Sequence, residues 1–266
     1  MKKLSFTFLF CVLALTSTIV NSAMVGVYID EDFSSGLGSY LQGANSNSTS
    51  QSADTDGSVE VSGGLAMMHP TSTIFGTEAL PFVSLASGQS AVLTLYGMTV
   101  TDDTPRPGYT MIGFTDVKDT LNTGNTGFAS LGGPSSATGT YMRMYTRGPA
   151  GIKGPNTGFS RSSFADGLPH DWIITLSKAL DGTMSFRVQC EDKDLDWNTL
   201  DGFNGVSAAE WATYLPTTAI VPHIRFTDMD SVGNGLLTID RLVYEVVPEP
   251  ATIVLLGMGL ALLRKK

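Results

Sequence analysis

The sequence has 266 residues, which is enough for one large domain with a sizeable hydrophobic core, and it contains 29 glycines but only 15% charged residues. Its net charge is −9, and the stretch from 24 to 246 holds 11 basic residues against 24 acidic ones. A chain this acidic has no electrostatic footprint for nucleic acid, which excludes that class of partner, and it would be repelled by anionic lipid surfaces.

The first residues, 1–23, predict a secretory signal peptide, because a short basic start (MKK) precedes an apolar core and a set of small residues. Cleavage is expected before Ala23, with the bond after Ala23 as the alternative, and a permanent N-terminal anchor is the rival interpretation. Cys11 lies in this segment, so the body contains only Cys190 and no internal disulfide is expected. No CxxC or Cys/His metal-ligand spacing is present, and Cys190 is expected to be a small buried apolar residue.

The body between the two ends predicts β-strands separated by loops rich in Gly, Pro, Ser and Asn. Asp181-Gly182 is a hairpin signal, and after it every second residue from Met184 to Cys190 is apolar, which predicts one buried face. The expected strands cover residues 25–33, 90–100, 109–114, 140–147, 172–177, 184–190, 220–227 and 236–247.

One helix and one long loop interrupt the strands. Ser207 and Glu210 form a capping box that begins a helix, and the helix is expected to end by Leu215. The segment 43–57 (GANSNSTSQSADTDG) has the composition of a surface loop. Without an internal repeat or linker, we expect a single domain from 24 to 246.

Many half-buried strands and few helices predict an all-β fold, an antiparallel β-sandwich of the jelly-roll kind. The opening Asp-Glu-Asp-Phe-Ser at 30–34, the central hairpin and the closing Ile-Asp-Arg-Leu-Val-Tyr at 239–244 resemble the concanavalin A-like, laminin-G-like sandwich. A carbohydrate-binding-module jelly roll is the nearest alternative.

Catalytic residues are not evident, and we expect the chain not to be an enzyme. Glucanases of the sandwich class place clustered acids on one strand in a Glu-x-Asp-x-x-Glu pattern, which this sequence lacks. The densest acidic run, 191–196, is interpreted as a solvated loop, and His69, His170 and His223 as ordinary surface or loop histidines. A divergent glycan hydrolase or a purely structural envelope protein are the alternative functions.

Two sets of acids are candidate calcium ligands, because Ca²⁺ prefers hard oxygen donors. The first set joins the two ends of the body and consists of Asp30, Asp32 and Asp240, since the first and last strands of jelly rolls often lie side by side. The second is the turn 228–235, which contains Asp228, Asp230 and Asn234. Turn-forming or outward-facing acids are the alternative for both, and no other cofactor is predicted.

A ligand-binding face is predicted on the strand 140–147. Its alternate residues Tyr141, Arg143, Tyr145 and Arg147 belong to one face of a sheet, about 7 Å apart in succession. Tyrosines stack on sugar rings and arginines bind carboxylates, so this face suits an acidic polysaccharide. An outer sheet face with ordinary cross-strand pairs is the alternative.

The C-terminal segment 247–266 (VPEPATIVLLGMGLALLRKK) combines two prolines, an apolar run and a basic end. The apolar run 251–263 would span about 20 Å as a helix, against about 30 Å of hydrocarbon, so it predicts a weak anchor with its basic end in the cytoplasm. Pro248, Glu249 and Pro250 are expected to form a stiff, extended and exposed hinge.

This segment resembles the PEP-CTERM sorting signal, which an exosortase in the bacterial inner membrane recognises. The resemblance implies that Pro248, Glu249 and Pro250 are the recognition motif. We therefore expect an exported surface or matrix protein, anchored by its C-terminal helix until an exosortase processes it. Its non-catalytic sandwich would bind exopolysaccharide.

Overall fold

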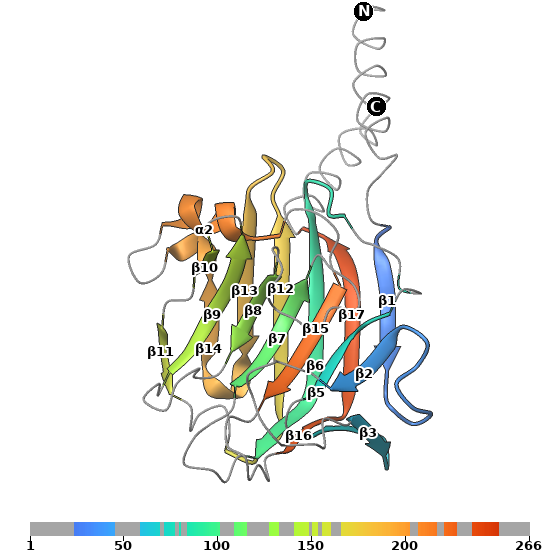
Figure 1. The fold of residues 1–266 in the computed structure, drawn as a ribbon. Helices are drawn as coiled ribbons and strands as arrows, with labels where there is room; N and C mark the ends of the chain where they lie inside the picture. The colour runs from blue at the N-terminus through green and yellow to red at the C-terminus, as the bar shows by residue number, and fades with distance from the viewer. Residues whose placement is uncertain are drawn as a thin grey trace, which may run out of the picture.

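The computed structural model describes residues 24–45, 59–69, 72–77, 80, 84–101, 109–115, 128–132, 141–148, 151–153, 156–160, 166–202, 207–216, 221–227 and 236–249. Within these residues the chain forms two antiparallel sheets that face each other as a sandwich (Figure 1). This confirms the predicted all-β class.

The first sheet has nine described strands, in the order β14-β13-β12-β6-β16-β4-β3, with β17 beside β6 and β1 beside β17. Its strands are β1 (Gly26–Glu31), β3 (Val59–Ser62), β4 (Leu65–Met68), β6 (Gln89–Thr101), β12 (His170–Lys178), β13 (Met184–Cys190), β14 (Leu195–Asn198), β16 (Leu236–Ile239) and β17 (Arg241–Pro248). As predicted, the first and last strands of the body pair with each other.

The second sheet has eight described strands, in the order β10-β9-β8-β7-β15-β5-β2, with β11 beside β9. Its strands are β2 (Leu41–Asn45), β5 (Ser72–Gly76), β7 (Tyr109–Thr115), β8 (Phe128–Gly132), β9 (Tyr141–Gly148), β10 (Gly151–Lys153), β11 (Asn156–Ser160) and β15 (Val221–Thr227).

The core lies between the sheets and is built from rows of side chains in register. In the first sheet, Tyr244, Leu93, Ile174 and Val188 occupy directly paired positions on four adjacent strands, and all are fully buried. The Phe114 ring of the second sheet packs against Tyr244, with 6.2 Å between the ring centroids. The contact joins the two layers and adds aromatic packing to the hydrophobic burial.

Two predicted local features are confirmed. The hairpin between β12 and β13 turns at Asp181-Gly182, where Gly182 has a φ of +88° and Asp181 Oδ1 accepts from the Thr183 amide at 2.9 Å. The helix α2 (Ala208–Tyr214) begins at Ser207, whose hydroxyl accepts from the Glu210 amide at 3.2 Å.

Several strand predictions were wrong or incomplete. The segment 43–57 is not all loop, because β2 continues through Asn45. The strand expected at 236–247 is two strands, β16 and β17, which break at Asp240 and pair with β6 in one continuous register. The short strands β3, β4, β5, β8, β10, β11 and β14 were not predicted, because runs of three to five residues carry too little periodicity to be recognised.

The long strand β6 is irregular at Gly97, and this irregularity positions the start of β12. Gly97 has a φ of +60°, and the pairing with β12 shifts there, so that Trp172 lies opposite Leu95 and His170 opposite Met98. The Gly97 amide donates to Asp171 Oδ1 at 2.8 Å, which holds the bulge in place.

Candidate functional site

The first two residues of the Pro-Glu-Pro motif belong to the sandwich. Pro248 is the last residue of β17 and pairs with Gln89, and the Glu249 amide donates to the Gly88 carbonyl at 2.8 Å. Proline is compatible with this position because the β1 pairing ends at Val246, so no partner requires its missing amide hydrogen. The expected exposed hinge is therefore wrong for Pro248 and Glu249, which are half-buried, and the sheet extends beyond residue 246.

The environment of Glu249 opposes its negative charge. Burial raises the pKa of the Glu249 carboxyl above its ordinary value, and the charge of Asp181 in the nearby hairpin raises it further. A carboxyl whose pKa is raised by folding stabilises the fold at low pH. This contribution is lost as the pH rises above the unfolded value of about 4.3. The sorting motif is thus held to the body less firmly when Glu249 is ionised.

We expect Glu249→Gln to raise the free energy of unfolding at pH 7 by a few tenths of a kcal/mol, because this half-exposed group is partly screened by solvent. At pH 3.5 the difference should vanish. Thermal unfolding of the full chain at the two pH values measures this, with Glu245→Gln on the same strand as the control. A variant that is less stable than the parent at pH 7 would contradict the expectation.

The structure does not bring the calcium candidates Asp30, Asp32 and Asp240 together, which corrects that prediction. Asp30 forms a bidentate ion pair with Arg241, with N–O distances of 2.7 and 2.8 Å. Asp32 accepts a hydrogen bond from the Ser34 amide at 3.0 Å. Hydrogen bonds from Arg241 lower the pKa of Asp30. The first carboxylate is thus already neutralised, and no described group of three ligand atoms includes any of these acids.

Two other predicted sites fall partly or wholly outside the described residues. The turn 228–235 lies outside them. Tyr141, Arg143, Tyr145 and Arg147 lie on β9, whose backbone is described but whose side chains are not. This prediction of a ligand face therefore remains untested. The signal peptide 1–23 and the segment from Pro250 onwards also lie outside the described residues.

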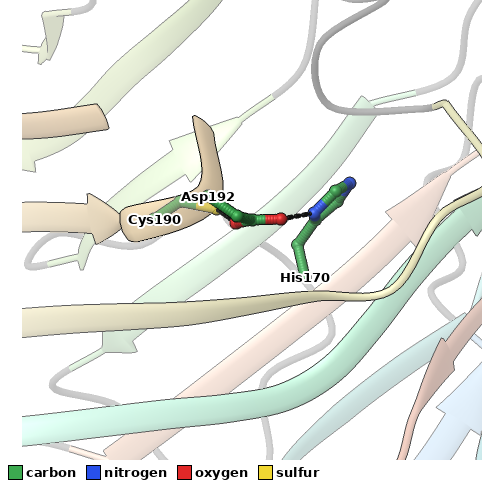
Figure 2. A group of neighbouring side chains, drawn as sticks. All are labelled: His170, Cys190 and Asp192. Carbon is green, nitrogen blue, oxygen red and sulfur yellow. Dashed lines mark hydrogen bonds and ion pairs between the residues drawn. The ribbon is translucent and has the colours of Figure 1, made fainter. Parts of the chain in front are cut away.

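A cluster that the sequence did not predict lies at the end of the hairpin formed by β12 and β13. His170 begins β12, Cys190 ends β13, and Asp192 lies in the short turn η2 (Glu191–Lys193) (Figure 2). His170 Nδ1 contacts an Asp192 carboxylate oxygen, and Cys190 Sγ donates to the other oxygen at 3.0 Å. A second carboxylate, Asp166, lies 3.0 Å from His170 Nε2.

Each member of this cluster reaches it for a local reason. His170 continues the alternation of Trp172 and Ile174, so its side chain lies on the buried face and is only 4% exposed. Cys190 ends the buried face of β13, as predicted. The turn η2 ends at Asp194, which has a left-handed backbone conformation (φ 51°). Within this tight turn, the Asp192 side chain lies beside Cys190 and His170.

The charges of the cluster are balanced by hydrogen bonds. Burial raises the pKa of Asp166, but bonds from Lys193, the Leu168 amide and His170 outweigh it, so the pKa is held well below its ordinary range. Burial also raises the pKa of Asp192, but its hydrogen bonds with Cys190 and His170 lower it by more, so the pKa lies below its ordinary value. The His170 ring thus lies between two carboxylates, with Nδ1 facing Asp192 and Nε2 facing Asp166.

The Cys190 thiol is held in its protonated form in this state of the cluster. Burial raises its pKa to about 12, and the bond to Asp192 contributes in the same direction. A thiol with this pKa is a poor nucleophile at neutral pH, so the cluster does not have the features of a Cys/His catalytic pair.

Two sequence interpretations are corrected here. His170 is not a surface or loop histidine, and the acidic run 191–196 is not a loop but the turn η2 followed by the start of β14. The register of the β12–β13 hairpin is the feature that could have predicted this contact. Ile174 pairs with Val188 and Ile173 with Gln189, so continuing this register outward places His170 opposite Asp192. Both lie eleven positions from Asp181, the predicted turn residue.

Residues 246–266 match the family model of the PEP-CTERM protein-sorting motif. The C-terminal segment is a PEP-CTERM motif. This motif marks exported proteins that an exosortase sorts, which agrees with the expected class of partner. Among the residues that the structure describes, no helix has the length and hydropathy needed to cross a membrane. A comparison with curated proteins found no match.

The described domain has the concanavalin A-like lectin sandwich fold. The carbohydrate recognition domain of Emp47p superposes with a TM-score of 0.52 at 9% identity, covering 82% of this chain and 94% of that one. Arcelin-5, a lectin-like defence protein from Phaseolus vulgaris, gives 0.51 at 7% identity, with 85% and 100% coverage. An endo-1,3-beta-glucanase from Streptomyces sioyaensis gives 0.48 at 9% identity, with 85% and 96% coverage. At these identities the likeness concerns the fold alone.

Proposed function

We propose that this protein is an exported surface or extracellular-matrix protein, sorted by an exosortase, whose sandwich binds extracellular polysaccharide without catalysing a reaction on it. The PEP-CTERM motif at 246–266 carries the sorting part of this proposal. The basic leader and apolar core of residues 1–23 supply the export signal, and the apolar run 251–263 holds the chain in the membrane until processing. The mature chain is then displayed outside the inner membrane.

Intact-mass measurement of the surface protein from its native host tests the sorting part. We expect a mass that lacks residues 1–22, from cleavage before Ala23, and the tail 251–266. Surface material that retains the tail would overturn processing.

The binding part rests on the fold and on the register of the second sheet. Met144 on β9 pairs with Leu131, and Leu131 pairs with Ile112, which is fully buried between the sheets. Because strand positions alternate between faces, the register positions of Arg143 and Tyr145 belong to the outer face. Emp47p's carbohydrate recognition domain supports the suitability of this sandwich for sugar binding.

The cross-strand neighbours of these positions are small residues. Tyr145 pairs with Ser130, which pairs with Gly113, and Arg143 pairs with Gly132. Gly113 is itself buried, so the proposed sugar contacts belong to β9. Two tyrosines and two arginines along β9 therefore suit an acidic polysaccharide.

We expect the double variant Tyr141→Ala, Tyr145→Ala to lower affinity for the host's purified polysaccharide about tenfold, since each aromatic contact contributes about 0.5–1.5 kcal/mol. Retention on immobilised polysaccharide measures the change. Tyr40 and Tyr96 are 39% and 38% exposed elsewhere on the domain, and their double alanine variant is the matched control. Unchanged retention by the first variant, or an equal loss in the control, would exclude this face.

A further inference from the structure

We propose that His170, Cys190 and Asp192 form a binding site for one zinc ion, with ligand atoms His170 Nδ1, Cys190 Sγ and a carboxylate oxygen of Asp192. The three atoms all lie within 4.8 Å of one another, and no other described group of three His, Cys, Asp or Glu residues does this. They come from the end of one strand, the start of another and the turn between β13 and β14, so the fold assembles them (Figure 2).

The donor set selects the metal. A thiolate and an imidazole are borderline-to-soft ligands that suit Zn²⁺, whereas Ca²⁺ and Mg²⁺ take oxygen ligands almost throughout. Histidine, cysteine, aspartate and glutamate are the residue types that bind zinc in proteins, and this site contains the first three. Calcium is therefore not the ion that this site fits.

The site must open to accept the ion, because His170 Nδ1 and the Asp192 carboxylate lie closer together than two ligand atoms of one zinc ion. Zinc bonds of about 2.0–2.3 Å at tetrahedral angles place ligand atoms about 3.3–3.6 Å apart. Cys190 Sγ and Asp192 Oδ1 lie 3.0 Å apart, and the third atom lies within the same small volume. Asp192 sits in a three-residue turn with an exposed side chain, so it can make the remaining adjustment by side-chain rotation.

A second carboxylate orients the histidine as zinc sites require. Zinc-bound histidines almost always donate their other ring N–H to a carboxylate, carbonyl or water, which fixes the ring. Here His170 Nε2 lies 3.0 Å from Asp166 Oδ1, and Asp166 is itself held by Lys193 and by the Leu168 amide at 2.9 Å. Nδ1 is thereby directed at Cys190 and Asp192.

Charge is conserved when the ion binds. Zn²⁺ displaces to solvent the Cys190 thiol proton, and the His170 Nδ1 proton of any ring that holds one there, and it forms bonds to sulfur, nitrogen and oxygen. The thiolate and the Asp192 carboxylate then neutralise the two positive charges, while Asp166 remains paired with Lys193. Three protein ligands leave the fourth tetrahedral position open. Because the Asp192 side chain is 51% exposed, that position faces water or an oxygen ligand from solution.

Zinc and cobalt titrations of the full chain test the site, in a Cys11→Ser background that leaves Cys190 as the only thiol. We expect one zinc per chain, and with Co²⁺ as the spectroscopic substitute a thiolate-to-cobalt charge-transfer band. Cys190→Ser should abolish the band and weaken zinc binding about a hundredfold or more. Asp166→Asn should weaken zinc binding about 10–100-fold through the histidine and keep the band.

Asp192→Asn and Glu191→Gln form a matched pair, because both residues are exposed acids on the same turn. The first should weaken zinc binding at least about tenfold, and the second should not change it. Asp192→Asn lies outside the core, so its result stands even if Cys190→Ser misfolds, which circular dichroism checks. The proposal is overturned if the parent retains no zinc after dialysis, if no charge-transfer band forms, or if Asp192→Asn binds zinc as tightly as Glu191→Gln.

Discussion

Replacing Glu249 with glutamine is expected to leave the C-terminal tail attached to the exported protein. Glu249 is the one charged residue in the Pro-Glu-Pro core of the PEP-CTERM motif at 246–266. An enzyme that recognises this carboxylate loses a charge-assisted contact when an amide replaces it, and such contacts contribute about 1.5–3 kcal/mol. Processing should therefore slow about tenfold or more. The readout is the ratio of tailed to tailless chains in intact-mass spectra of native-host fractions.

Glu245→Gln is the matched control, because it makes the same chemical change on β17, four residues before Glu249. Its processing should equal that of the parent. Glu249→Gln is expected to stabilise the fold slightly. Retention of the tail in this variant would therefore not be explained by a folding defect. Normal processing of Glu249→Gln would show that Glu249 is not recognised through its charge.

The position of Glu249 also has a consequence for the order of events. Its amide is hydrogen-bonded to Gly88, and Pro248 pairs with Gln89, so the first two residues of Pro-Glu-Pro are held at the edge of the finished sheet. An extended peptide in an enzyme cleft needs these hydrogen bonds for itself. The enzyme can therefore bind the motif in one of two ways. Either the last residues of β17 first separate from β6, or the enzyme binds them before they have paired with β6.

The second large effect is expected at Gly97. A Cβ built there overlaps the Asp240 carboxylate, well inside the 3.0 Å that real Cβ atoms keep, and the φ of +60° disfavours any side chain. We expect Gly97→Ala to lower the free energy of unfolding by about 1–3 kcal/mol, mainly through backbone strain at this positive φ, because the exposed Asp240 side chain can rotate away from part of the overlap. Denaturant unfolding of the full chain measures the loss.

Gly182 supplies the control for this effect. It also has a positive φ, +88°, but a Cβ there meets nothing within 4 Å. Gly182→Ala should therefore cost only the backbone term, about 1–2 kcal/mol. Combining Gly97→Ala with Asp240→Ala should recover part of the larger loss, because the overlapping atoms are then gone. Equal losses at the two glycines would mean that the Asp240 contact contributes nothing.

Features set by neighbouring residues could be predicted from the sequence. The alternation from Met184 to Cys190, the hairpin at Asp181-Gly182 and the helix cap at Ser207 each depend on interactions within a few positions, and the structure confirms all three. The C-terminal motif is likewise a linear signal, because its residues are consecutive in the sequence.

Long-range contacts decided the rest. Asp30 was a reasonable calcium candidate until the pairing of β1 with β17 placed the Arg241 guanidinium against it. Pro248 and Glu249 have the composition of a hinge, but Pro248 pairs with Gln89 at the start of β6 and the Glu249 amide donates to the adjacent Gly88 carbonyl. In both cases the partner lies far away in sequence, so local pattern alone contains no information about it.

The sequence by itself determined the strand-rich class, the buried face of β13 and the sorting motif, because periodicity and linear motifs are local properties. Only the tertiary structure decided that His170, Cys190 and Asp192 meet. That meeting depends on the β12–β13 register, on the bulge at Gly97 and on the tight turn after Cys190 acting together. A shift of one residue in that register would move alternate side chains to the opposite face and separate the three ligand atoms.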